Sequence, residues 1–316
     1  MRPHHESDEA RGDGSGKPAR STRRSLCVQT RALGKREVMR IRRRAGAVWQ
    51  NAFSLVERRM PTLAENKSVW DASYDWGCSG EEWSEAWGTP QAQWAGCLYP
   101  RIFPFLKGRI LEIAPGHGRW TQFLRGHCTS LIGVDLAATC VSECRSKFKS
   151  DPRLHFEVGD GRKLPMVADA SIDFAFSFDS LVHAEADILE SYASELARVL
   201  KPNAIAFLHH SNLATLTERS IWDKLKCRWA GVPINDSWRA YSMSAKAMRE
   251  FAERVGMSCA QQELIPWGTG YPVLMDCMST IINAPNQPCV IIENRRFMEE
   301  AARIRRISEL ARPPNV

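Results

Sequence analysis

Short apolar runs alternate with amphipathic segments across the middle of the chain, and this alternation constrains the fold more than any other feature. The runs are 109–113, 130–134, 154–158, 172–177 and 204–209. Candidate helices lie near 119–126, 137–149, 187–200 and 244–254. Strands that alternate with helices of this length form βαβ units, in which a parallel sheet carries helices on both faces. Two late apolar runs, 259–266 and 273–282, are expected to form an antiparallel hairpin at the sheet edge.

The predicted fold is therefore an α/β, doubly wound, Rossmann-like domain with a mainly parallel sheet of seven strands. We expect a disordered basic tail at 1–35 and a helical N-terminal extension at 36–95. The α/β domain is expected at 96–300, followed by a C-terminal helix end and tail at 301–316. Residues 213–243 interrupt the alternation without a strand pattern, and insertions of this kind often cover an active site, which predicts a helical lid.

The net charge of +7 belongs to the N-terminal tail. Residues 1–60 hold 15 basic and 6 acidic residues, whereas the rest of the chain is close to neutral. Such a tail suits a solvated extension, a nucleic acid or peripheral contact with an anionic membrane. No stretch reaches the roughly 18 apolar residues of a membrane span, and the N-terminus lacks the apolar segment of a secretory signal. We expect a cytoplasmic protein.

The ten cysteines include no C-x2-C pair, and no histidine follows at zinc-finger spacing. Free thiols in this number suit a reducing compartment. We therefore expect neither a metal nor a disulfide.

Acids and glycines follow the ends of the first three predicted strands. The first strand runs into a turn that carries Gly116 and Gly118, and glycine lets a backbone approach a ligand closely. Glu112 precedes that turn and suits a cationic ligand, whereas it would repel the pyrophosphate of a dinucleotide. Asp135 ends the second strand, where a carboxylate can bind a ribose diol, and Asp160 ends the third. Ligands of open α/β sheets bind at this carboxyl edge.

The series Glu112-x-Ala114-x-Gly116-x-Gly118, Asp135 and Asp160 resembles the ordered motifs of class I S-adenosylmethionine-dependent methyltransferases over about residues 96–300. The resemblance implies S-adenosylmethionine as cofactor, with its methionine end at turn 114–118 and its amino group near Glu112. It places the ribose at Asp135 and the adenine at Asp160 and Gly161. The implied cofactor-binding set is Glu112, Ala114, Gly116, His117, Gly118, Asp135, Leu136, Asp160, Gly161 and Phe178.

Ala114 departs from the family pattern, which usually has glycine at this position. Alanine is tolerated there if its φ is negative. The alternative for the whole series is a sheet whose strand-end acids cap helices.

The fourth predicted strand leaves through Asp179-Ser-Leu-Val-His183. In the resembling family this exit lies beside the transferable methyl group. A hydroxyl acceptor loses its proton as it attacks, so a nearby base is useful, and the pKa of histidine suits that task. We expect His183 to act as base and Asp179 to orient or assist it. The alternative is that His183 caps the helix beginning near Ala186 while Asp179 only lines the cofactor pocket.

Polar residues also follow the fifth predicted strand. His209 and His210 point to opposite sides of the strand, so one is expected to face the pocket. We expect His209, His210, Asn212 and Arg239 to contact the substrate. Structural roles for the histidines and a surface ion pair for Arg239 remain alternatives. The tryptophans at 70–94 and 222–238 either stack on a planar or sugar acceptor or pack internally.

These patterns predict O-methylation of a hydroxylated small-molecule or glycan acceptor by in-line displacement. The chain also loosely resembles the sugar and polysaccharide O-methyltransferases. Nucleic acid is disfavoured because the α/β part is near neutral and carries no recognisable RNA-binding module. Methylation of RNA or protein through the basic tail is the alternative, and a non-catalytic cofactor-binding or scaffold domain is a second one.

Overall fold

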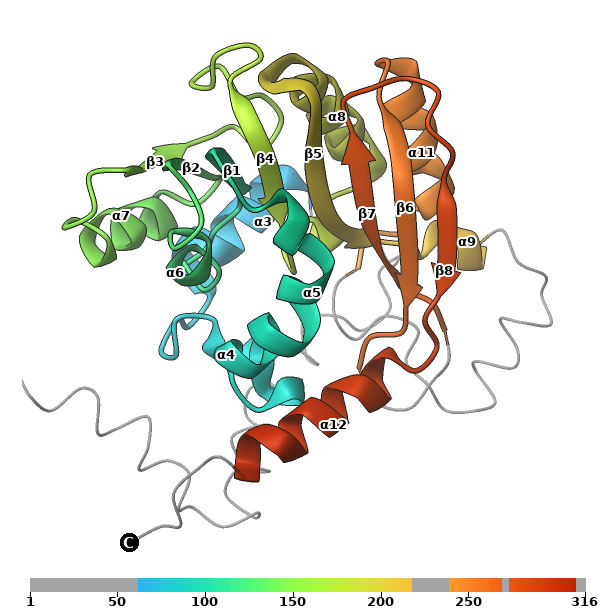
Figure 1. Ribbon diagram of the computed structural model, residues 1–316. Coiled ribbons are helices and arrows are strands. Elements are labelled where there is room, and N and C mark those ends of the chain that lie inside the picture. The colour runs from blue at the N-terminus through green and yellow to red at the C-terminus, as the bar shows by residue number, and fades with distance from the viewer. Residues whose placement is uncertain (1–61, 218–238, 269–272, 311–316) are drawn as a thin grey trace, which may run out of the picture. The chain divides into compact units, whose positions relative to one another are not determined.

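The computed structural model describes residues 62–217, 239–268 and 273–310. These residues form one sheet of eight strands in the order β3-β2-β1-β4-β5-β7-β6-β8 (Figure 1). The strands are β1 (Arg109–Ile113), β2 (Ser130–Asp135), β3 (Leu154–Val158), β4 (Ile172–Ser177), β5 (Leu200–Ser211), β6 (Ser258–Ile265), β7 (Asp276–Ile282) and β8 (Val290–Glu293).

The sheet is mainly parallel, which confirms the predicted α/β Rossmann-like fold. Strands β1 to β5 pair in parallel, while β7 lies antiparallel between β5 and β6. The structure adds an eighth strand, since β8 pairs in parallel with β6 and forms the edge in place of the hairpin. The strand order reverses between β1 and β4, and ligands bind at the carboxyl edge of such a switch point.

Helices cover both faces of the sheet because the central strands carry buried residues on both faces. On β1, Ile110 and Leu111 are both fully buried but belong to two different cores. One core lies under α8 and α11, and the other lies under α6, α7 and the N-terminal segment (Figure 1). The helices after β1 are α6 (Thr121–Leu124), α7 (Ala138–Lys147), α8 (Ala186–Val199), α9 (Ala214–Thr217), α11 (Ala245–Arg254) and α12 (Phe297–Leu310).

A chain of short helices precedes β1, and we call residues 62–105 the lead-in. Its elements are α3 (Leu63–Ser68), the π-helical η2 (Val69–Ser73) and η4 (Trp94–Leu98), α4 (Pro90–Gln93), α5 (Tyr99–Ile102), and the 3-10 helices η3 (Glu81–Trp87) and η5 (Phe103–Phe105). The C-terminal helix α12 packs on the lead-in, where Ser308 Oγ donates to the Trp87 carbonyl at 3.4 Å.

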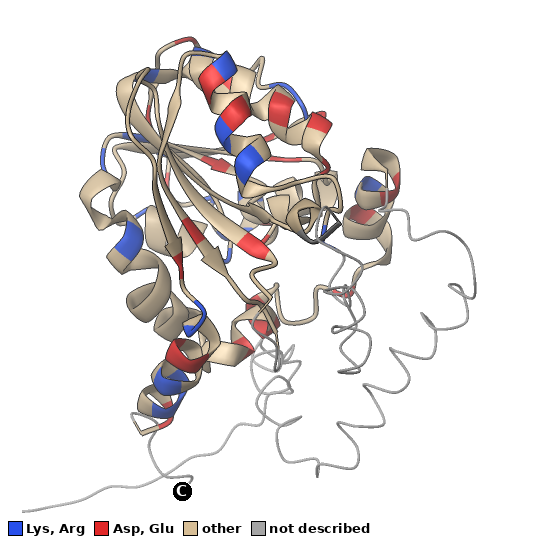
Figure 2. Cartoon of the chain, turned by 90° about the vertical axis from the view of Figure 1, so that its right-hand side faces the viewer, with Lys and Arg blue, Asp and Glu red and all other residues tan. Residues whose placement is uncertain are grey.

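Several expected segments lie partly or wholly outside the described residues. The basic tail and most of the lid, 218–238, belong to this group, and so do residues 311–316. No helix within the described ranges is long and apolar enough to cross a membrane. In the view of Figure 2, ribbon positions of basic and acidic residues intersperse along several helices.

Candidate active site

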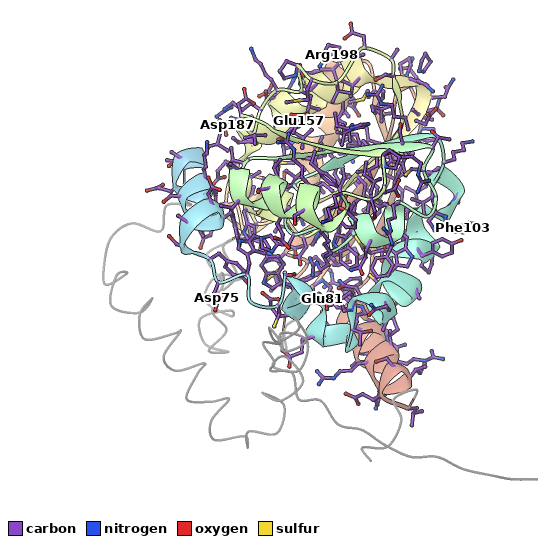
Figure 3. The ribbon with its side chains drawn as sticks, turned by 90° about the vertical axis from the view of Figure 1, so that its left-hand side faces the viewer. Asp75, Glu81, Phe103, Glu157, Asp187 and Arg198 are labelled. Carbon is purple, nitrogen blue, oxygen red and sulfur yellow. The ribbon has the colours of Figure 1, made fainter. Side chains whose placement is uncertain are left out.

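A cavity of about 410 Å³ opens at the carboxyl edge of β1, β2 and β4. Its walls come from the turn after β1, the end of β2, the exit of β4 and the first part of the lead-in. Figure 3 shows the lead-in residues Asp75 and Glu81 at the opposite end of the domain from Arg198. Arg198 lies near the end of α8, just before the amino end of β5. A volume of this size falls within the usual range of small-molecule sites.

The turn after β1 has a left-handed backbone at three positions. Gly116 and Gly118 have φ values of 57° and 75°, and Ala114 has a φ of 56°. The condition under which alanine is easily tolerated here, a negative φ, is therefore not met. Two hydrogen bonds hold the residue in place, because its amide donates to the Val134 carbonyl at 2.8 Å and its carbonyl accepts from Ser180 Oγ at 3.1 Å. An L-residue pays roughly 1–2 kcal/mol for this conformation.

Gly118 is required for packing rather than for ligand approach. A Cβ at this position would lie 2.5 Å from the Phe148 ring. At Gly116 a Cβ would lie 3.1 Å from the Trp76 ring, so a side chain there would fill the cavity wall. At both positions a close aromatic neighbour thus explains why the residue is glycine.

Asp135 stands at the cavity wall with both carboxylate oxygens oriented. The amide of Gly116 donates to Oδ2 and the amide of Ala137 donates to Oδ1, each at 2.9 Å. A carboxylate has about four acceptor positions, so capacity remains for the two hydroxyls of a ribose. Burial raises the pKa of Asp135, and backbone hydrogen bonds oppose that rise. Leu136 lines the same wall.

Glu112 lies behind the turn and does not line the cavity. It is 1% exposed, and Thr121 Oγ1 donates to its Oε2 at 2.5 Å. Its Oε1 has no hydrogen-bond partner within the described part of the chain. Burial raises the pKa of Glu112 to about 7. The implied role of Glu112 toward the methionine amino group would therefore act through the backbone of the turn and water, and its side chain supports the start of α6.

Asp160 and Gly161 have different environments at the end of β3. Asp160 is exposed, and its Oδ1 accepts from the amides of Arg162 and Lys163 at 2.8 and 2.7 Å. These contacts close the turn after β3, where no helix begins within the described residues. Gly161 lines the cavity with a φ of 78°, and a Cβ there would come within 2.8 Å of Leu63 Cδ1.

The lead-in supplies a wall of the cavity that sequence reasoning left undecided between acceptor stacking and packing. Trp76 stacks on His117, with ring centroids 4.1 Å apart and planes 13° apart. Asp71 Oδ1 accepts from the amide and the hydroxyl of Thr139 at the start of α7, both at 2.8 Å. These contacts attach the lead-in to the carboxyl edge. The dense tryptophan spacing over 70–94 was the signal for this wall.

Asp179 lines the cavity but its charge is already paired. Arg119 Nη2 donates to Asp179 Oδ2 at 2.8 Å, and both side chains are almost fully buried. The Arg119 guanidinium also lies over the rings of Trp83 and Trp120, at 5.2 and 4.6 Å. Sequence reasoning missed Arg119, because nothing in its local pattern indicates a buried ion pair. The pair forms part of the wall and leaves Asp179 poorly suited to accept a proton.

His183 ends the 3-10 helix η6 (Leu181–His183) and lines the cavity. Its ring centroid lies 5.6 Å from that of Trp70. It does not cap α8, since the amide of Ala186 donates to Ser242 Oγ at 2.8 Å. Phe178 is buried and lines the same side. The structure thus brings His183 and Phe178 to the cavity with Asp135 and the turn after β1.

The four expected substrate residues, in contrast, lie behind the cavity wall. Their exposed fractions are 0% for His209 and His210, 3% for Asn212 and 4% for Arg239. None of the four is among the described residues that line the cavity. The physical reason is the position of β5, which runs between β4 and β7 and is covered on both faces.

Each of these side chains has an internal partner. Arg239 Nη2 lies 2.9 Å from Asp276 Oδ2. Although burial acts to raise it, Arg239 and His209 hold the pKa of Asp276 well below its usual range. His210 Nε2 lies 2.8 Å from Ser279 Oγ, and burial lowers the His210 pKa to about 4. Asn212 Oδ1 accepts from the amide of Ala245 at 2.9 Å. These buried positions and internal partners favour structural roles for the four side chains over contact with a substrate.

Comparison with known proteins identifies a family model that matches part of this chain. Residues 110–203 match the model of a methyltransferase domain. The chain is 28% identical over 151 residues to the biotin biosynthesis bifunctional protein BioHC of Cellvibrio japonicus, covering 48% of this chain and 28% of that protein. It is 38% identical over 52 residues to ribosomal RNA small subunit methyltransferase A of Geobacter metallireducens, covering 16% and 19% of the two chains. The chain therefore spans less than a third of either curated relative.

Among solved structures, a S-adenosylmethionine-dependent methyltransferase from Mesorhizobium loti superposes with a TM-score of 0.45 at 18% identity, over 60% of this chain and 97% of that one. A protein of Pyrococcus horikoshii superposes with a TM-score of 0.46 at 23% identity, over 61% and 90%. The matched residues 110–203 hold the turn after β1, Asp135, Gly161 and the β4 exit. Residues 110–203 of this chain therefore form a methyltransferase domain, with S-adenosylmethionine as its cofactor.

Proposed function

We propose that this protein transfers the methyl group of S-adenosylmethionine to a hydroxyl of a small acceptor bound in the same cavity. One observation carries the proposal: Asp135, the turn at Ala114–His117 and His183 meet on the walls of a single cavity. The residues that would hold the cofactor and a candidate base thus line the same cavity. Such closeness lets positioning supply much of the acceleration.

The residues present suit the cofactor. Asp135 keeps acceptor capacity for ribose hydroxyls beside the two amides it already binds. The backbone of the turn, free of a side chain at Gly116, would hold the methionine part, and Leu136, Gly161 and Leu63 would hold the adenine. When bound, S-adenosylmethionine supplies a methyl group on a positively charged sulfur.

His183 is the candidate base on the cavity wall. A hydroxyl acceptor must give up its proton as its oxygen attacks, and a positioned histidine contributes typically 10²–10⁴-fold to such a step. Asp179 is committed to Arg119, so we assign it to the wall and not to proton transfer.

A carbohydrate acceptor now has less support than a smaller, less polar one. The expectation of a carbohydrate acceptor relied on four polar residues that are all buried behind the cavity wall: His209, His210, Asn212 and Arg239. The alternative of RNA or protein methylation relies on the basic tail, which lies outside the described residues.

The test is formation of S-adenosylhomocysteine from S-adenosylmethionine in the presence of a hydroxylated-metabolite extract. We expect His183→Ala to bind S-adenosylhomocysteine normally while turnover falls by about 10²-fold or more. His155→Ala is the matched control, because His155 is exposed on β3 and lies outside the cavity. Normal turnover of His183→Ala at saturating cofactor would exclude the base assignment.

A further inference from the structure

We call the part of the cavity beside His183 the acceptor end, and aromatic rings form much of its wall. Trp70, Trp76 and Trp83 line it from the lead-in, with ring centroids 5.5 to 6.1 Å apart. Trp76 stacks on His117 and approaches Gly116, so it covers the methionine end of the cofactor site. Trp70 and Trp83 are then left to face the acceptor.

The β4 side adds further rings at the same end. Trp120 and Phe178 line the cavity, with ring centroids 5.8 Å apart. The His183 ring lies 5.6 Å from Trp70 at an interplanar angle of 42°. An acceptor that reaches His183 therefore passes along an aromatic surface.

Charged side chains that line the cavity already bind other groups of the chain: Glu185 accepts from the Ser242 amide at 3.0 Å, and Asp187 pairs with Arg162. Arg119 and Asp179 bind each other at 2.8 Å. Ser180 Oγ donates to the Ala114 carbonyl at 3.1 Å. A sugar carries several hydroxyls, and each hydroxyl left without a partner on burial costs roughly 1–3 kcal/mol. The surroundings of His183 thus suit a ligand with one reacting hydroxyl better than a polyol.

Charge argues against a cationic acceptor. Aromatic faces attract ammonium groups, but the faces of Trp83 and Trp120 already carry the guanidinium of Arg119, at 5.2 and 4.6 Å. Arg119 is held there by its ion pair with Asp179, so the ring faces that it covers are not open to a second cation. A neutral planar ring gains from stacking on a ring face that Arg119 leaves open.

We propose that the acceptor is a planar aromatic molecule with a phenolic hydroxyl, held against Trp70 and Trp83 with its oxygen toward His183. This inference rests on the proposed function and narrows it. The phenolic proton passes to a neutral imidazole nitrogen of His183 while the oxygen forms its new bond to the methyl carbon. The carbon–sulfur bond breaks with its electron pair going to sulfur, which leaves an aryl methyl ether, S-adenosylhomocysteine and a proton that the imidazolium returns to water.

The experiment measures binding of three probes to protein saturated with S-adenosylhomocysteine: 2-naphthol, methyl glucoside and choline. Calorimetry is expected to show that 2-naphthol binds at least tenfold more tightly than the other two. Trp70→Leu and Trp83→Leu are expected to weaken 2-naphthol by tenfold or more without changing the affinity for S-adenosylhomocysteine. Phe103→Leu is the control, since Phe103 is 56% exposed, does not line the cavity and lies at the edge of the domain (Figure 3).

The outcomes separate this inference from the proposed function. Preference for methyl glucoside or choline, or no binding of 2-naphthol to protein that binds S-adenosylhomocysteine, overturns the aromatic acceptor alone. Unchanged 2-naphthol affinity in whichever tryptophan variant folds also overturns it. A wild-type protein that does not bind S-adenosylhomocysteine overturns the proposed function itself.

Discussion

The backbone amide of Asp179 donates a hydrogen bond to Nδ1 of His209, with 3.2 Å between the two nitrogens. Because Nδ1 accepts, a neutral His209 carries its proton on Nε2, which lies 3.2 Å from Asp276 Oδ2 but outside good hydrogen-bond geometry. Asp179 has a φ of 64°, a strained conformation for a residue with a side chain. A buried imidazole thus supports a strained residue of the cavity wall.

Substitution of His209 tests this support with two variants of similar polarity. In His209→Asn the side-chain oxygen reaches about the position of Nδ1, whereas in His209→Gln the amide group reaches that of Nε2. We expect His209→Gln to lower the free energy of unfolding by about 1–3 kcal/mol more than His209→Asn, because it leaves the Asp179 amide without its acceptor. Urea unfolding of both proteins measures the difference. Equal losses would show that the contact does not support the wall.

Ala114→Gly tests the strain in the turn after β1. Glycine removes roughly 1–2 kcal/mol of left-handed strain and costs about 0.5–1 kcal/mol through the greater freedom of the unfolded chain. We therefore expect the free energy of unfolding to stay level or to rise by about 1 kcal/mol. Ala114→Val should lower it clearly, since a β-branched residue at positive φ is a strong outlier. Destabilisation by glycine in urea unfolding would contradict the assigned backbone conformation.

Glu112 makes stability depend on pH in a specific direction. Its pKa rises from 4.5 to about 7 on folding, so the folded state binds its proton more tightly than the unfolded chain. The tighter proton binding of Glu112 therefore adds its full stability below pH 4.5. This added stability is lost as the pH rises from 4.5 through about 7. The total decline is about 3 kcal/mol.

Glu112→Gln keeps an acceptor for the Thr121 hydroxyl and does not titrate. We expect the variant to lose the decline in stability between about pH 5 and 8 that the wild type shows. Urea unfolding across this range measures both slopes. Identical slopes would mean that Glu112 ionises as it does in the unfolded chain.

Asp71 attaches the lead-in to the start of α7, so its removal should affect both stability and cofactor affinity. Loss of a capping carboxylate costs typically about 1 kcal/mol. We expect Asp71→Ala to show this loss and to bind S-adenosylhomocysteine several-fold more weakly. Asp75→Ala is the control, because Asp75 accepts only from the nearby Gly77 amide among the described residues (Figure 3). Equal affinities in the two variants would separate the lead-in from the cofactor site.

The sequence was sufficient for most of the fold because the signals involved are local. Apolar runs predicted β1 to β7, and the helix at 244–254 matches α11 (Ala245–Arg254), which Ser244 caps through the Ala247 amide. The strand β8 was missed although Val290, Ile291 and Ile292 form a short β-branched run, and all four residues of this edge strand are exposed.

The site was predictable only where a residue's role follows from its place in a strand. Asp135 was found in this way, because it ends β2 beside the switch point. His209 and His210, near the end of β5, were misplaced by the same reasoning, since alternation gives the side of a strand but not what covers it. Arg119 and the tryptophan wall depend on contacts with distant segments, so no local pattern predicts which of them reaches the cavity.

The central claim is that this cavity binds S-adenosylmethionine through Asp135. Calorimetric titration with S-adenosylhomocysteine tests it, on the wild type and on Asp135→Asn, with urea unfolding to confirm that both proteins are folded. The account predicts a single site in the wild type that the substitution weakens by tenfold or more, about 1.4 kcal/mol. Absence of binding to the folded wild type, or equal binding by the two proteins, would contradict it.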